Sequence, residues 1–113
     1  NLMSKLITSP VKRFPGTVTL AEPLTFPMFF AWKQALEAAK EIITANGTQA
    51  EFDRAMLPGI CACVEKWELE NFPPMVRPET FPATKRRNST TLIAWVIKEI
   101  GEVVMGEEEI PNA

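Results

Sequence analysis

The sequence predicts a small, mainly α-helical domain with three to four helices, and three observations support this fold class. Apolar residues recur at three- and four-residue spacing in three segments, over residues 26–45, 48–69 and 89–106. A Pro-rich connection over residues 72–87 separates the second segment from the third. Finally, 46% of the residues are hydrophobic and 23% are charged, which is typical of a globular chain.

The length of 113 residues is that of one domain. We expect this domain to have three parts: an extended arm over residues 1–24, a helical body over residues 25–106, and an acidic tail over residues 107–113. No internal repeat and no second domain is visible in the sequence.

The arm shows no helical period, but it contains signals of a turn and a strand. Pro15-Gly16 is a turn signal, and residues 17–20 alternate polar and apolar side chains as a short half-buried strand does. A strand needs a partner, which either residues 6–14 or the extended region after Phe72 can supply.

The first helix is predicted from Phe26 to Ala45. Thr25 can cap it, and Pro27 falls in the first turn, where its missing N–H costs nothing. Asn46-Gly47 should end it, because both residues tolerate the left-handed conformation of a helix terminus. Its predicted apolar positions are Met28, Ala31, Trp32, Ala35, Leu36, Ala39, Ile42 and Ile43.

The second helix should begin at Thr48, where Thr48 and Glu51 have the spacing of a capping box. Pro58 interrupts its apolar period, so we expect either a kink or two helices, over residues 50–57 and 58–69. The stretch WELENFPP then reads as a helix terminus, in which Trp67 continues the apolar face and two prolines forbid further helix. The Pro-rich segment that follows should be extended and lie on the helices.

The third helix should be capped by Asn88 or Ser89 and stopped by Gly106. Its apolar arc is wider than one stripe, which suggests a second buried contact with a partner. We therefore expect a protein-binding surface that combines this helix with the Pro-rich segment. The candidate residues are Leu92, Trp95 and Val103 from the helix, and Met75 and Phe81 from the segment.

Catalysis, metals and cofactors are disfavoured by the residue inventory. The chain has no histidine, which is the usual base of nucleophilic catalysis and a frequent metal ligand. Cys61 and Cys63 read as small buried apolar residues, and no Gly-rich phosphate loop is present. We expect no enzymatic activity, no catalytic residue, no cofactor and no metal.

Nucleic acid and membranes are disfavoured as partners. The net charge is −2, and the basic cluster Lys85-Arg86-Arg87 has no interleaved aromatic residues, so a solvated cluster is the simpler interpretation. No leader sequence and no apolar run of membrane-spanning length is visible. We expect a cytoplasmic protein.

The order of these signals resembles a known family. A Pro-Gly turn, a strand and a helix with Trp32 lie in FPGTVTLAEPLTFPMFFAWKQAL, a central helix with Trp67 in AMLPGICACVEKWELENFP, and a last helix with Trp95 in ETFPATKRRNSTTLIAWVIKEI. From about Phe14 to the end, the chain resembles the tail assembly chaperones of long-tailed bacteriophages and prophages. The likeness is a pattern of apolar anchors without a diagnostic motif.

The resemblance implies a non-enzymatic, cofactor-free helical chaperone that forms homo-oligomers in the host cytoplasm. Its partners would be the tape measure protein, which such chaperones coat, and the subunits of the tail tube. An alternative is a structural component of the phage particle, such as a tail or head–tail joining protein, that stays in the virion.

Overall fold

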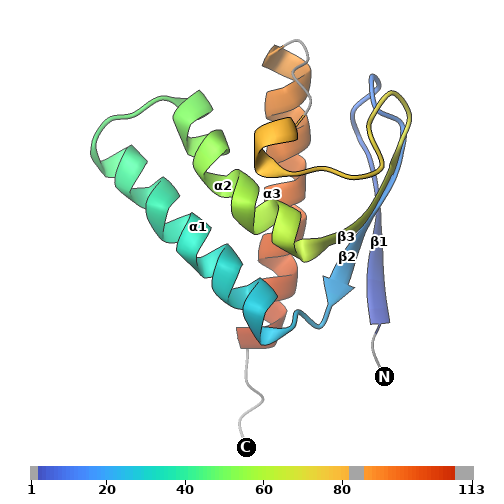
Figure 1. Cartoon of the computed structure of the whole chain (residues 1–113), viewed down its shortest axis with the longest axis horizontal. Helices are drawn as coiled ribbons and strands as arrows, with labels where there is room; N and C mark the ends of the chain where they lie inside the picture. Colours follow the sequence, from blue (N-terminus) through green and yellow to red (C-terminus); the bar gives the residue numbers. More distant parts are fainter. Residues whose placement is uncertain (1–2, 82–85, 109–113) are drawn as a thin grey trace, which may run out of the picture.

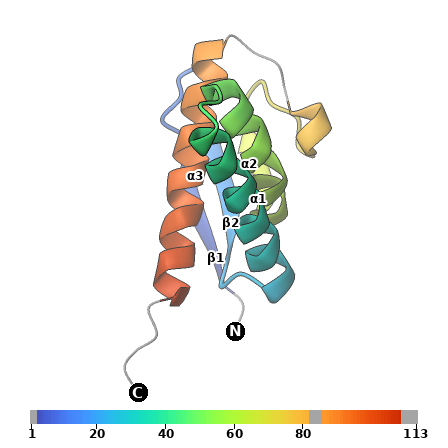
Figure 2. The ribbon, with the colours of Figure 1, turned by 90° about the vertical axis from the view of Figure 1, so that its left-hand side faces the viewer.

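The computed structural model describes residues 3–81 and 86–108, with side chains described for residues 4–81 and 89–106. In the described residues, three α-helices lie on one side of a three-stranded antiparallel sheet, and α1 packs against α2 away from the sheet (Figures 1 and 2). In chain order, the elements are β1 (Met3–Thr8), β2 (Gly16–Glu22), α1 (Phe26–Thr44), α2 (Gln49–Cys63), β3 (Val64–Leu69), the 3₁₀ turn η1 (Pro78–Thr80) and α3 (Arg86–Glu108).

The prediction of a mainly α-helical fold is wrong, because the sheet makes this an α+β domain. The strand expected over residues 17–20 is present as β2, which lies between β1 and β3 in the order β1-β2-β3. β1 overlaps one of the two regions that were expected to pair with this strand. The second partner, β3, comes from residues 64–69, which were expected to be helical, and not from the region after Phe72.

β3 shows why the sequence misled at this point. Trp67 fits both the helical period of α2 and an alternating strand, so the apolar pattern alone does not distinguish the two. In the structure, α2 ends at Cys63, and the alternation places Trp67 and Leu69 in the core while Glu68 is exposed. Pairing with β2 supplies the backbone hydrogen bonds that an isolated strand would lack.

α1 and the start of α2 follow the sequence closely. The Thr25 hydroxyl accepts a hydrogen bond from the Met28 N–H at 3.4 Å, and Asn46 adopts a left-handed φ of 61° after the end of α1. The capping box of α2 is also confirmed. The Thr48 hydroxyl accepts from the Glu51 N–H at 3.1 Å, while the Glu51 carboxylate accepts from the Thr48 N–H at 2.7 Å.

Of the two alternatives expected at Pro58, two separate helices are not found, since α2 runs as one helix from Gln49 to Cys63 with Pro58 inside it. Pro58 lies on the exposed side of α2, where the carbonyl left without its N–H partner can face water. The next residue, Gly59, faces α1. A Cβ atom on Gly59 would lie 2.9 Å from Ala35 Cβ and 3.1 Å from Trp32 Cα, so this glycine allows the two helices to approach closely.

α3 begins and ends outside its predicted limits. It starts at Arg86, so Asn88 and Ser89 lie inside it rather than at its cap, and it passes Gly106 and ends at Glu108. A Cβ atom on Gly106 would meet no neighbour within 4 Å, and one exposed glycine weakens a helix without stopping it. The predicted acidic tail is therefore helical at its first two residues, and its remainder, like Lys85 of the basic cluster, lies outside the described residues.

The core lies between the helices and the inner face of the sheet. α3 contributes a continuous apolar face to it, made of Leu92, Ile93, Val96, Ile100, Val103 and Val104, all buried. At the edge of the sheet, the Lys5 ammonium on β1 forms ion pairs with Glu99 at 3.5 Å and Glu102 at 3.7 Å on α3. These contacts hold β1 against α3.

The Pro-rich segment packs on β3 through an aromatic cluster. The Phe72 and Phe81 rings lie 5.1 Å and 6.0 Å from the Trp67 ring, and 5.7 Å from one another. Phe14, in the loop between β1 and β2, completes the cluster at 5.3 Å from Phe72. The segment is thus fixed to the body, to the sheet through this cluster and to α2 through η1, so the expectation that it lies on the helices holds at η1.

Candidate protein-binding surface

The five residues predicted to bind a partner do not form one exposed surface. Leu92 and Val103 are 0% and 4% exposed and belong to the core of the chain itself. Trp95 and Phe81 are half-buried against that core. Met75 is 80% exposed, and it is the only one of the five among the exposed large apolar side chains of the described residues.

The wide apolar arc of α3 has an intramolecular explanation. α3 packs both on the sheet and on α2, so two adjoining stripes of its surface are buried within one chain. The second buried contact inferred from the sequence is therefore made by the same chain, and the arc gives no independent indication of a partner.

A different apolar surface is exposed at the start of α1. Phe26 and Phe30 are 75% and 52% exposed, and their rings stack with centroids 6.0 Å apart and an interplanar angle of 18°. We call these two side chains the aromatic ridge. Next to it, the Lys33 ammonium lies 5.6 Å from the centroid of the Phe29 ring, on the flank of the helix between the ridge and the core.

Helix geometry explains why the ridge faces outward. At about 100° per residue, Phe30 and Phe26 lie roughly 160° and 120° around the helix from Trp32. Trp32, which is 3% exposed, packs in the core together with Ala35 and Ala39. The capped start of α1 thus holds two phenyl rings on the side that faces away from the rest of the protein.

Exposed apolar side chains are common when they stand singly, and Leu6, Ile43 and Met105 are of this kind. A stacked pair of phenyl rings is a contiguous apolar patch. It is a candidate contact surface, because aromatic rings bury much area for each side chain that is immobilised.

A signal of the ridge was present in the sequence but was not used. Phe26, Phe29 and Phe30 have the i, i+3, i+4 spacing of one helix face, and the centre of that face is turned away from the stripe of Trp32, Ala35 and Ala39. The sequence interpretation counted only the positions that fitted the core stripe. The residues left outside that stripe were the ones to examine for binding.

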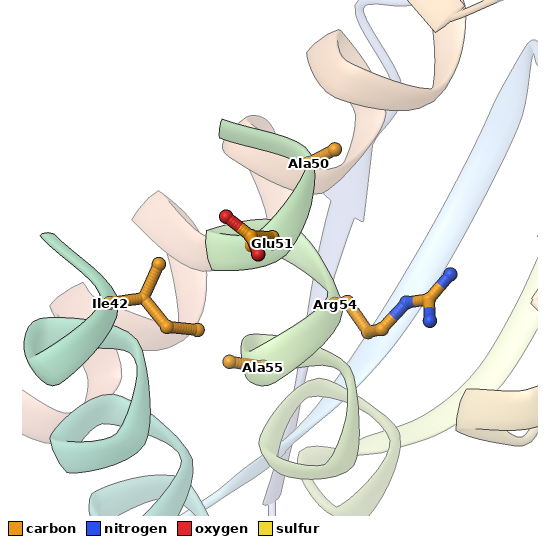
Figure 3. A pocket seen from close by; sticks show the side chains of 5 residues that line it. All are labelled: Ile42, Ala50, Glu51, Arg54 and Ala55. Atoms are coloured by element: carbon orange, nitrogen blue, oxygen red, sulfur yellow. The ribbon is translucent and has the colours of Figure 1, made fainter. Parts of the chain in front are cut away.

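The far end of the α1–α2 hairpin carries a groove of about 500 Å³ (Figure 3). Ile42 of α1 and Ala50, Glu51, Arg54 and Ala55 of α2 line it. The Ile42 and Ala55 side chains point toward one another, whereas the Ala50 methyl group and the Arg54 guanidinium point to the side of α2 away from Ile42. We call this hollow the hairpin groove.

A second hollow of about 730 Å³ lies between α2, η1 and α3 and contains the buried carboxyl group of Asp53. Burial raises the pKa of Asp53 above its ordinary value, and a hydrogen bond from Gln49 Nε2 to Asp53 Oδ1 at 2.8 Å acts in the opposite direction. A carboxyl group held by an amide in this way is a satisfied structural group, and it has no histidine near it, since the chain contains none.

The cysteines are not arranged for catalysis or for metal binding. The Cys63 thiol donates to the Met28 carbonyl at 3.7 Å, and burial, together with the nearby Glu79 carboxylate, raises the pKa of the Cys61 thiol to about 11. Cys61 therefore stays protonated at neutral pH. Within the described residues, no cluster of three His, Cys, Asp or Glu side chains could hold a metal ion.

In the part of the chain that the structure describes, no helix has the length and apolar character needed to cross a membrane. Comparisons with protein-family models, with curated proteins and with solved structures found no match to this chain.

Proposed function

We propose that this chain is a non-enzymatic protein-binding module that uses the aromatic ridge to cover apolar surface on a partner. The single observation that carries this proposal is the stacked, solvent-exposed pair Phe26 and Phe30. The capping of α1 by Thr25 and the packing of Trp32 hold the pair in place before binding. A preorganised surface of this kind loses little conformational entropy on association.

The resemblance to tail assembly chaperones supplies the class of partner. The apolar surface would belong to the tape measure protein or to tail tube subunits, and binding would take place in the cytoplasm of the host. The resemblance was drawn in part from TFPMFFAW, the stretch that contains the ridge. The positions that support the likeness thus include those that the structure leaves exposed.

The test is coexpression with a tape measure protein encoded beside this chain in a tail-gene region. The parent should keep the partner in the soluble fraction and purify with it. The double variant Phe26→Asp/Phe30→Gln should lose this effect, whereas Met105→Gln, which removes an isolated exposed apolar side chain on α3, should keep it. Equal partner solubility with parent and ridge variant would contradict the proposal.

Mass spectrometry of purified phage particles separates a chaperone from a structural component. A chaperone is absent from the finished particle, so peptides of this chain should not be found there. Retention at a fixed number of copies would instead identify a structural tail or joining protein.

A further inference from the structure

We infer that the free edge of β1 binds an extended segment of a partner protein, which adds to the sheet as one more strand and carries basic side chains on the face next to α3. The inference goes beyond the proposed function, because the surface it concerns does not include the aromatic ridge. It names a second binding surface on the chain and the chemistry of the segment that fits it.

β1 is an edge strand whose outer backbone groups have no partner. The strand order β1-β2-β3 leaves one side of β1 without a neighbouring strand in the described residues. The Ser9 N–H donates to the Gly16 carbonyl at 2.9 Å, and hydrogen-bonded pairs alternate along an antiparallel ladder, so the odd-numbered residues of β1 bond to β2. The residues that direct their backbone N–H and C=O groups away from the sheet are Ser4, Leu6 and Thr8.

These three residues are exposed, Leu6 to 63%. Such an edge is a template for a further strand, because its N–H and C=O groups match those of any extended chain. An inward-pointing charge often protects an edge strand, and Lys5 has that position. Its charge is compensated, however, by Glu99 at 3.5 Å and Glu102 at 3.7 Å, so it does little to keep another strand away.

α3 flanks this edge on the inner side of the sheet. α3 lies beside β1 and runs in the opposite direction, and the ion pairs of Lys5 show which flank of α3 faces the strand (Figures 1 and 2). At about 100° per residue, Trp95 lies roughly 40° from Glu99 and 20° from Glu102 around the helix. Trp95 is half-buried, so this flank offers two carboxylates and part of an indole ring to a strand added at β1.

The charges near β1 on the inner side of the sheet favour a basic segment. The acidic residues there are Glu22, Glu99 and Glu102, and the basic ones are Lys5 and Lys98. Lys12 and Arg13 belong to the loop that follows β1, beyond the other end of the strand. A Lys or Arg side chain in the added strand offsets the excess of carboxylates, and its apolar stem can pack on the Trp95 indole.

The same charges disfavour a second copy of the chain as the occupant. Two β1 edges paired with one another would bring the Glu99 and Glu102 carboxylates of both copies together, and like charges on paired elements repel. The occupant is therefore a segment of a different protein in which basic residues alternate with β-branched ones. The β-branched residues have high strand propensity and lie beside Leu6 on the outer face.

Amide hydrogen exchange followed by NMR tests the inference with a synthetic peptide, blocked at both ends, in which lysine alternates with valine. At about 2 mM peptide, the Leu6 and Thr8 amides should exchange at least about fivefold more slowly, because their outward N–H groups gain acceptors. The Ile7 amide already bonds to β2 and should change little. Peptides with glutamate in place of lysine, or with proline in place of valine, should not protect these amides.

Variants of the chain locate the site. Leu6→Pro removes only an outward N–H, which an edge strand tolerates, and should raise the dissociation constant of the peptide at least about tenfold. Leu6→Thr keeps this N–H and is the matched control. Glu102→Gln should raise the constant about two- to fivefold, whereas Glu37→Gln, which changes an exposed glutamate paired with Lys40 on α1, should leave it unchanged. Circular dichroism and thermal unfolding check the fold of each variant. If Leu6→Pro does not fold, the proline peptide and Glu102→Gln still decide.

Four results would overturn the inference. The lysine peptide could leave the Leu6 and Thr8 amides unprotected, the glutamate peptide could protect them equally, or Leu6→Pro could bind like Leu6→Thr. Protection of these amides when the chain alone is concentrated would assign the edge to a second copy. The ridge variant Phe26→Asp/Phe30→Gln should bind the peptide like the parent, so a failure of the proposed function and a failure of this inference are separate results.

Discussion

Trp32 and Phe30 lie two positions apart on α1, yet one is 3% exposed and the other 52% exposed. Both are large aromatic residues, so side-chain type does not decide which of them faces the core. Their angular position on the helix decides it, because α2 covers one side of α1 and leaves the other open. The buried side should determine stability, and the open side should determine binding.

Loss of the indole on the buried side should have the largest effect. Trp32→Ala should destabilise the protein by about 3–5 kcal/mol, since it removes a buried aromatic side chain and leaves a cavity. Phe30→Ala should cost less than about 0.5 kcal/mol, because the site is exposed. Urea denaturation followed by fluorescence or circular dichroism measures both. Similar decreases in the free energy of unfolding for Trp32→Ala and Phe30→Ala would contradict the assignment of Trp32 to the buried side of α1 and Phe30 to the open side.

A methyl group added beside Trp32 should have the next largest effect. Gly59→Ala should destabilise by about 1–3 kcal/mol, because the new Cβ would lie 2.9 Å from Ala35 Cβ, and the helices would have to move apart. Gly106→Ala is the matched control, since its Cβ meets no neighbour and the change should stabilise α3 by up to about 1 kcal/mol. A stabilising Gly59→Ala would refute the close contact between α1 and α2.

On the open side, an acidic substitution should even help folding. Phe26→Asp should raise the free energy of unfolding by about 0.3–1 kcal/mol, because Phe26 is the first residue of α1 and the first turn contains no acidic residue. The same variant should bind a partner more weakly. Thermal unfolding and a binding assay on one preparation show whether stability and binding change in opposite directions.

The smallest effect concerns Asp53, on the side of α2 that faces η1 and α3. Its pKa is raised in the folded protein above the ordinary value of 3.8, so ionisation is disfavoured in the fold. Ionisation of Asp53 therefore lowers the free energy of unfolding as the pH rises from the pKa of this group in the unfolded chain through its pKa in the folded protein. The free energy lost in this way is not regained at neutral pH. Asp53→Asn, whose side-chain carbonyl can still accept from Gln49, should gain stability over the parent between pH 3 and pH 7. Urea denaturation measures the free energy of unfolding of both proteins. A difference between parent and variant that is the same at pH 3 and at pH 7 would contradict this.

The sequence predicted the elements whose signals are local. The cap at Thr25, the capping box of Thr48 and Glu51 and the end of α1 at Asn46-Gly47 each depend on residues within a few positions of one another. β3 was missed because its identity depends on β2, more than 40 residues earlier in the chain, which takes Trp67 into the sheet. Local patterns cannot contain that pairing.

The proposed binding surface was missed for a related reason. Leu92 and Val103 looked like surplus apolar area because the sequence does not show that α3 covers both the sheet and α2. Phe26 and Phe30 fell outside the apolar stripe predicted for the first helix, and their exposure is evident only once the position of the core is known. The number of apolar residues can be counted from the sequence. Which of them are buried and which are exposed depends on the tertiary contacts.

The most direct test of the ridge as a binding surface is ¹⁹F NMR with fluorophenylalanine placed at Phe26, Phe30 or the buried Phe14. The solvent isotope shift between H₂O and D₂O reports how exposed each ring is. At low concentration, the shifts at positions 26 and 30 should be large and the shift at position 14 small, in line with exposed fractions of 75%, 52% and 1%. On addition of the tape measure protein, the shifts at positions 26 and 30 should fall toward the value at position 14. Rings that stay exposed in its presence would contradict the claim that the ridge binds protein.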